Sequence, residues 1–186
     1  GISTSELDLL TSEIAYSNST KHPDYDKLAI KIMISRLHKD TPSTFSECVN
    51  TLSNATDSFG NNKSLLDEGF IKFVKKHAHV LDTTINYNRD FDFDYFGYKT
   101  LERSYLLKTF IKDSGSKLIP KIVERPQHMW MRVSVAIHKD SNSIQDIVNT
   151  YEMLSTKQFT HATPTLFNAG LIKNQLSSCF LIANKS

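Results

Sequence analysis

Apolar residues recur every three or four positions through the first eighty residues, a spacing that predicts α-helices rather than strands. The first helix is expected over residues 4–17, where Ser3 and Glu6 form a capping box at its start. Its apolar positions are Leu7, Leu10 and Ile14. Three further helices follow by the same criterion, over about residues 23–39, 45–52 and 64–80. The N-terminal region is therefore predicted to be entirely helical.

The middle of the chain departs from this helical period. Asp and aromatic residues alternate between residues 86 and 110, which predicts an extended segment or a loop packed by its own rings. The stretches RSYLLKTFIK and KLIPKIVER then flank the polar turn DSGS, a pattern that favours a β-hairpin. Pro120 would confine the second strand to a sheet edge. Two further helices are expected, one opened by Pro126 and one capped by Ser143.

The stretch TPTLFNAG predicts one short helix near the C-terminal end. Thr163 and Pro164 have the residue types favoured at an N-cap and at the first helical position, and Gly170 suits the left-handed residue after the last turn. A helix N-terminus attracts anions, so this end, with the Thr163 hydroxyl, is a candidate phosphate site. A capped helix that binds no ligand is the commoner arrangement, and the local sequence leaves both interpretations open.

The next stretch, QLSSCFLIA, becomes continuously apolar, a pattern typical of a strand buried on both faces. Cys179 in this strand could be inert core filling, which is the usual state of a buried cysteine. Alternatively, the thiol and the neighbouring Ser178 hydroxyl could form part of a site at the start of the strand.

The composition indicates an ordinary folded protein, with 39% hydrophobic and 23% charged residues in a chain of 186. The net charge of +2, from 22 basic and 20 acidic residues, does not indicate a basic surface that would bind DNA or an anionic membrane. Two distant cysteines, no apolar leader and no long apolar run favour a cytoplasmic location. Histidine and cysteine spacings give no metal-site pattern.

Five blocks, in order, resemble the large catalytic subunit of eukaryotic class I ribonucleoside-diphosphate reductase: TKHPDYDKLA, FGYKTLERSYLLK, ERPQHMWMRVSVAIHK, FTHATPTLFNAG and QLSSCFL. The resemblance implies a mainly α fold in three parts. Residues 1–55 would be the helical remainder of an ATP cone, residues 56–175 a helical domain with a small β-hairpin, and residues 176–186 the first strand of a missing α/β barrel. Because the sequence begins with Gly1 rather than Met, we expect it to be a piece of a longer chain.

The resemblance also implies a reaction and its residues. The family reduces ribonucleoside diphosphates to 2′-deoxyribonucleoside diphosphates for DNA synthesis by thiyl-radical chemistry. Cys179 matches one cysteine of the redox-active pair, whose partner would lie outside this chain. Thr163 matches the position that binds the substrate diphosphate, and Ser178 the position that meets the ribose. The segment alone is expected to be inactive, because the residues that generate and relay the radical would lie elsewhere.

Regulation and partners follow from the same resemblance. Thr4, Asp8 and Lys39 match positions that contact the allosteric effectors ATP and dATP, although Thr4 and Asp8 are also residue types favoured near any helix start. No cofactor or metal is expected in this chain itself. The expected partners are a di-iron tyrosyl small subunit, further large-subunit copies in a homodimer or higher oligomer, and thioredoxin or glutaredoxin. The alternative function is a non-catalytic nucleotide-binding regulatory or assembly module.

Overall fold

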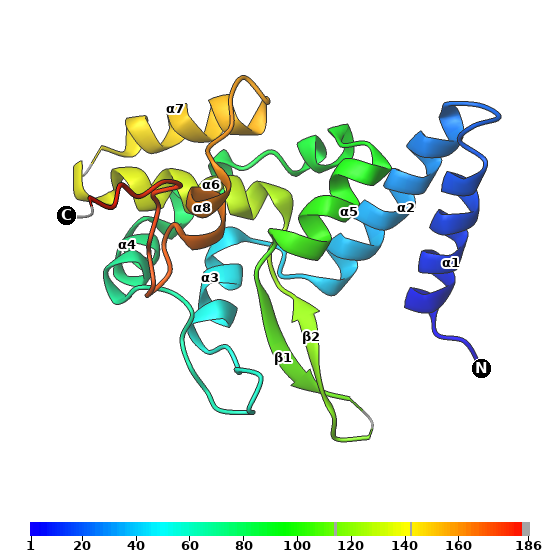
Figure 1. Ribbon diagram of the computed structural model, residues 1–186, viewed down its shortest axis with the longest axis horizontal. Helices are drawn as coiled ribbons and strands as arrows, with labels where there is room; N and C mark the ends of the chain where they lie inside the picture. The colour runs from blue at the N-terminus through cyan, green and yellow to red at the C-terminus, as the bar shows by residue number, and fades with distance from the viewer. Residues whose placement is uncertain (114, 142, 184–186) are drawn as a thin grey trace.

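The computed structural model describes residues 1–113, 115–141 and 143–183, and this part of the chain is mainly helical (Figure 1). It contains eight α-helices, two short 3₁₀ helices and one two-stranded antiparallel sheet. In chain order the elements are α1 (Thr4–Ser17), α2 (Asp24–Asp40), α3 (Phe45–Ser53), α4 (Glu68–Thr84), η1 (Tyr87–Asp92), α5 (Tyr95–Ser104), β1 (Lys108–Lys112), β2 (Leu118–Ile122), α6 (Pro126–His138), η2 (Lys139–Ser141), α7 (Ile144–Ser155) and α8 (Thr163–Asn168). The predicted mainly α fold with a small hairpin is confirmed.

Local capping signals explain where the N-terminal helices begin. The Ser3 hydroxyl accepts a hydrogen bond from the Glu6 amide at 3.2 Å, and the Glu6 carboxylate accepts one from the Ser3 amide at 2.8 Å. The predicted capping box of α1 is therefore confirmed. Helix α4 begins at Glu68 rather than near residue 64, because Asp67 is its N-cap and accepts from the Phe70 amide at 3.0 Å.

Helix α1 lies at one edge of the molecule and packs on α2 (Figure 1). Its buried residues are Ser12 and Ala15, whereas the apolar positions Leu7, Leu10 and Ile14 are exposed. The apolar spacing correctly predicted a helix, but this stripe does not face the core of the described chain.

Residues 87–92 and 95–104 form helices, so the predicted extended segment or loop is wrong there. The Asn86 side chain accepts from the Asn88 amide at 3.1 Å and starts η1, and the Asp94 side chain accepts from the Gly97 amide at 2.6 Å and starts α5. These short polar side chains act as helix caps, which the alternation with aromatic residues concealed. The predicted hairpin is confirmed, with Pro120 paired opposite Phe110 in the two-stranded sheet.

Helix α6 is the centre of the core, and its first ten residues are all buried. Helices α3, α4, α7 and α8 contact it, and one continuous cluster of buried residues extends from α1 to α8. The polar residues Gln127, His128, Arg132 and Ser134 are buried along with the apolar ones. Because a buried polar group needs hydrogen-bond partners, α6 carries a polar network that fixes its neighbours. The division of the chain near residue 55 stays a prediction.

His128 is held as a neutral ring in this network. Its Nδ1 accepts from the Arg125 amide at 3.4 Å, and its Nε2 lies 2.9 Å from the Tyr87 hydroxyl. Burial, together with the nearby charges of Arg125 and His38, lowers the pKa of His128 well below its ordinary value. The unfolded chain therefore binds a proton below about pH 6.5 that the folded chain does not bind at the same pH.

We accordingly expect the His128 contribution to the free energy of unfolding to fall by about 1.4 kcal/mol per pH unit below pH 6.5. Urea unfolding of wild type and His128→Gln between pH 7.5 and 5.5 measures this slope. The variant should lose that part of the pH dependence, whereas His22→Gln, at an exposed position, should keep it. Equal slopes in wild type and His128→Gln would show that His128 is not held neutral.

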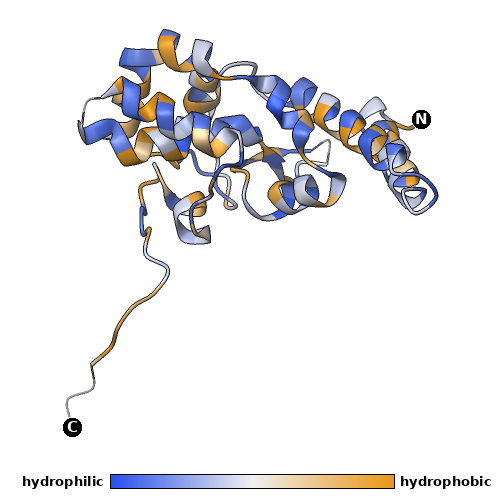
Figure 2. Cartoon of the chain, turned by 90° about the horizontal axis from the view of Figure 1, so that it is seen from above, coloured by the Kyte–Doolittle hydropathy of each residue, from blue (hydrophilic) through white to orange (hydrophobic). Residues whose placement is uncertain are grey.

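The predicted strand over QLSSCFLIA is wrong for the described chain. Residues 176–183 form no strand there, and the side chains of Phe180, Leu181 and Ile182 are exposed. Figure 2 shows this apolar segment running away from the helical body. A strand requires a neighbouring strand for its backbone hydrogen bonds, and the described residues provide none beside this segment.

Candidate functional site

Thr163 opens α8 but does not cap it. The N-cap is Ala162, so the helix begins one residue earlier than predicted. Thr163 is its first residue and Pro164 its second. The exposed Thr163 hydroxyl instead lies 3.2 Å from the Tyr105 hydroxyl, at the end of α5. Gly170 has φ +81°, which confirms the predicted left-handed residue after the last turn. The predicted Thr163 capping bond is wrong because the helix starts at Thr163 itself.

The two cysteines have opposite environments. Cys179 is exposed, with its sulfur 3.9 Å from the Ser178 hydroxyl oxygen, whereas Cys48 is buried on α3. The Cys48 thiol donates to the Val123 carbonyl at 3.6 Å, and burial raises its pKa well above the ordinary value. Both thiols are free. In the described chain, Cys48 therefore packs in the core, whereas Cys179 does not.

The structure ties the segment that carries Ser178 and Cys179 to α8 at its beginning. The Asn168 side-chain amide donates to the Gln175 carbonyl at 2.8 Å, and the Thr165 hydroxyl donates to the Leu176 carbonyl at 3.4 Å. Beyond this point the segment separates from the body (Figure 2). Thr163 and Cys179 are thus attached to the same short helix, but the described chain does not bring their side chains into contact.

A buried ion pair that sequence reasoning missed holds the other end of α8. Arg132 and Glu124 are each 1% exposed, and the guanidinium donates to both carboxylate oxygens, at 2.6 and 3.0 Å. Arg132 also donates to the carbonyls of Leu166 at 3.0 Å and Ala169 at 2.8 Å. Carbonyls at a helix end have no hydrogen-bond donors within the helix, and here Arg132 provides those donors. The sequence signal was available as a charged residue inside the apolar helix ERPQHMWMR.

The predicted effector residues lie between α1 and α2. Asp8 Oδ2 is 3.6 Å from Lys39 Nζ, and one turn away Arg36 Nε donates to the Ser5 hydroxyl at 2.7 Å. The three-residue spacing on both helices places these two contacts side by side. Thr4 is exposed at the start of α1, one turn before Asp8. The structure therefore brings Asp8 and Lys39 together and leaves Thr4 beside them on the same helix.

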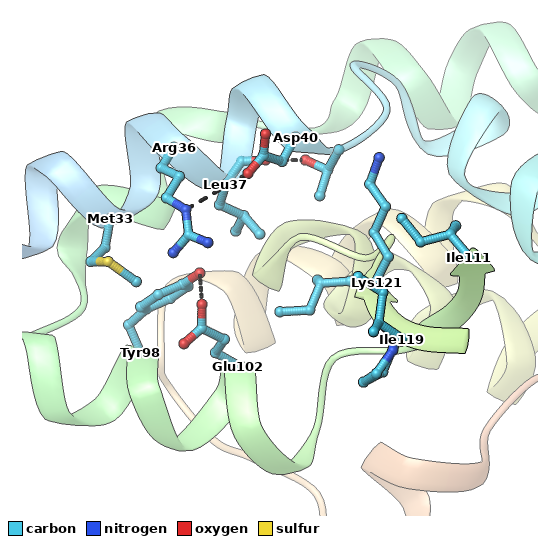
Figure 3. Close-up of a pocket in the computed structure, with 12 residues that line it drawn as sticks. Met33, Arg36, Leu37, Asp40, Tyr98, Glu102, Ile111, Ile119 and Lys121 are labelled. Carbon is cyan, nitrogen blue, oxygen red and sulfur yellow. Dashed lines mark hydrogen bonds and ion pairs between the residues drawn. The ribbon is translucent and has the colours of Figure 1, made fainter. Parts of the chain in front are cut away.

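A cleft of 210 Å³ lies close to this contact, between α2, α5 and the β-hairpin. Figure 3 shows Arg36 and Tyr98 on its wall, where the Tyr98 hydroxyl donates to Glu102 at 3.2 Å. Apolar side chains of Met33 and Ile119 also line it. None of the site residues predicted from the sequence lines this cleft.

Among residues 1–113, 115–141 and 143–183, no group of three or more His, Cys, Asp or Glu side chains could hold a metal ion. In the same residues, every helix is too short or too polar to cross a membrane.

Comparison with known proteins shows what the chain is similar to. The ribonucleotide reductase all-alpha domain matches residues 91–173. Over 186 residues, all of this chain, it is 47% identical to the "Ribonucleoside-diphosphate reductase large subunit" of Arabidopsis thaliana, covering 21% of that protein, and 47% identical to that of Danio rerio, covering 22%. Over 183 residues, 98% of this chain, it is 48% identical to that of Variola virus, again covering 22%.

The chain thus spans about a fifth of the length of these relatives. The alignment with each relative covers essentially all residues of this chain, from the α1–α2 pair to the exposed segment that carries Cys179. It includes the buried polar helix α6 and the short helix α8, which also lie within the matched all-alpha domain. The chain is therefore similar, over essentially all of its residues, to one part of ribonucleoside-diphosphate reductase large subunits, and its residues 91–173 match the ribonucleotide reductase all-alpha domain.

Proposed function

We propose that this chain forms part of an enzyme that reduces ribonucleoside diphosphates to 2′-deoxyribonucleoside diphosphates. The observation that carries the proposal is the exposed free thiol of Cys179 beside the Ser178 hydroxyl, in a chain similar throughout to large subunits of this reductase. An exposed thiol can reach a substrate and a second thiol, whereas a buried one cannot. The product would serve DNA synthesis, in the cytoplasm.

The proposed reaction replaces the ribose 2′-hydroxyl by hydrogen. The C2′–O bond breaks, the oxygen leaves as water, and two thiols lose their hydrogens and join as a disulfide, which supplies the two electrons. Cys179 is one of these thiols. The second belongs to the longer protein, because Cys48 is enclosed in the core. Ser178 meets the ribose, and the Thr163 hydroxyl binds the diphosphate.

Other subunits complete the proposed enzyme. A small subunit with a di-iron tyrosyl centre would supply the radical that starts the reaction. A second large subunit would form the homodimer or a higher oligomer, and thioredoxin or glutaredoxin would reduce the disulfide after each turnover. These partners follow from the large-subunit similarity together with the redox role given to Cys179.

The proposal is tested with the full-length subunit that carries this chain, combined with its small subunit, a dithiol and a ribonucleoside diphosphate. We expect formation of the matching deoxyribonucleoside diphosphate, and no product from residues 1–186 alone. Effector binding without any deoxynucleotide product from the full-length subunit would instead support the regulatory or assembly module.

The α1–α2 contact supports a regulatory role for Thr4, Asp8 and Lys39 in binding ATP and dATP. In the full-length subunit, Asp8→Asn removes the charge that faces Lys39 at 3.6 Å. We expect the ratio of ATP to dATP affinity to change on the order of tenfold, the size of one lost charged hydrogen bond. Titration of turnover with each nucleotide measures it, and Glu13→Gln on the same helix is the control. Unchanged dATP inhibition in Asp8→Asn would contradict the assignment.

A further inference from the structure

The short helix α8 depends on its surroundings for its position. It has six residues, too few for an isolated helix to be stable in water, so tertiary contacts hold it. Its first residue, Thr163, is exposed, whereas Thr165 and Leu166 are buried and the helix contacts α6. Any residue that fixes the buried end therefore also fixes where the exposed end lies.

We propose that Arg132 is the positioning residue for this helix and, through it, for the Thr163 hydroxyl in the substrate pocket. The inference rests on the proposed function for the role of Thr163. Arg132 is buried, and it acts through its hydrogen bonds to the Leu166 and Ala169 carbonyls.

The hydrogen-bonding capacity of arginine explains why this residue type stands here. A guanidinium has five N–H donors in a rigid plane, and Arg132 uses four of them. Two reach Glu124 and two reach the end of α8. Lysine has three donors on a single nitrogen and cannot span both partners in this fixed geometry. Glu124 in turn accepts from the Leu107 amide at 3.2 Å, so the pair also ties α8 to the base of the hairpin.

Contacts from a second direction make the end of α8 a defined anchor. The Asp67 amide, at the start of α4, donates to the Gly170 carbonyl at 3.0 Å. A side chain at Gly170 would lie 3.0 Å from the Phe70 ring and in a strained left-handed backbone, so the turn strongly favours glycine. Arg132 supplies the contact from α6, and the turn at Gly170 supplies the contact from α4. Without Arg132, the end of α8 loses its side-chain hydrogen bonds from α6 and keeps the contact from α4.

The test is the double variant Glu124→Gln/Arg132→Met in the full-length subunit. Removing both charges avoids leaving one of them buried alone, so the fold is retained while the two carbonyls lose their donor. We expect amide exchange of residues 165–171 to become at least about tenfold faster, with residues 144–155 of α7 unchanged. The KM for the ribonucleoside diphosphate should rise about tenfold with kcat within about twofold, because a mobile α8 weakens binding before chemistry.

Two comparison variants separate positioning from general loosening. Arg132→Lys keeps the charge, but its KM should be raised as in the double variant. The partly exposed pair Arg89 and Glu152, 2.8 Å apart, links η1 to α7 without touching α8. Its neutral double variant, Arg89→Gln/Glu152→Gln, should leave both the KM and the exchange of residues 165–171 unchanged.

Unchanged exchange of residues 165–171 in Glu124→Gln/Arg132→Met overturns the inference. So does faster exchange with an unaltered KM in an active enzyme. A wild-type subunit that forms no deoxynucleotide refutes the proposed function itself. In that case amide exchange alone decides whether Arg132 anchors α8.

Discussion

Cys179→Ser in the full-length subunit is expected to lower sustained turnover on the order of 10³-fold or more, while the fold stays intact. Serine has nearly the size of cysteine but cannot form the disulfide that we propose supplies the two electrons. Cys179 is exposed in residues 1–186, so the substitution in this chain leaves no buried unpaired hydroxyl, and its free energy of unfolding should change by less than about 0.5 kcal/mol. Dithiol-driven turnover of the full-length subunit and the melting temperature of residues 1–186 test the two parts.

Cys48→Ser is the matched control. Its hydroxyl would replace a thiol in the core, and we expect a loss of about 1–3 kcal/mol in the free energy of unfolding with unchanged turnover per folded molecule. The two substitutions thus separate into one that affects chemistry and one that affects stability. Normal turnover from Cys179→Ser would rule out its redox role.

Arg132→Met alone is expected to destabilise the 186-residue chain by about 3–5 kcal/mol. The substitution leaves the Glu124 carboxylate buried, 1% exposed, without its partner. It also removes the donors to two carbonyls at the end of α8. Urea unfolding followed by circular dichroism measures the difference.

The partly exposed Arg89–Glu152 pair provides the comparison. Arg89→Met should cost about 0–1 kcal/mol, the usual range for an ion pair in contact with water. Adding Glu124→Gln to Arg132→Met should recover part of the larger loss, because no buried charge is then left unpaired. A loss from Arg132→Met as small as that from Arg89→Met would show that the buried pair does not stabilise the core.

Local signals predicted most of the fold. The capping box at Ser3, the hairpin pattern around its polar turn and the cap at Ser143 each act within a few residues, and the structure confirms all three. The helical period also located α2 and α3 closely. Such features depend on hydrogen bonds between sequence neighbours, which a single sequence shows directly.

The remaining features depend on contacts between distant residues. The Leu7 stripe looks the same in sequence whether it faces core or solvent, and the apolar run after Ser178 forms a strand only if another strand pairs with it. The hydrogen bond from Arg132 to Leu166 joins residues 34 positions apart, so no local sequence pattern predicts it. For the candidate site, Cys179 and Thr163 were predicted from the sequence and their roles stay predictions, whereas the structure revealed how α8 is held.

The redox state of Cys179 after a single turnover tests the central claim most directly. The full-length subunit, reduced and freed of external dithiol, is mixed with small subunit and a ribonucleoside diphosphate, quenched with an alkylating reagent and analysed by mass spectrometry. We predict one Cys179 disulfide for each deoxyribonucleoside diphosphate formed, with Cys48 recovered as a free thiol. Deoxynucleotide that accumulates while Cys179 remains fully alkylated as a free thiol would contradict the proposed role of this chain in the reduction.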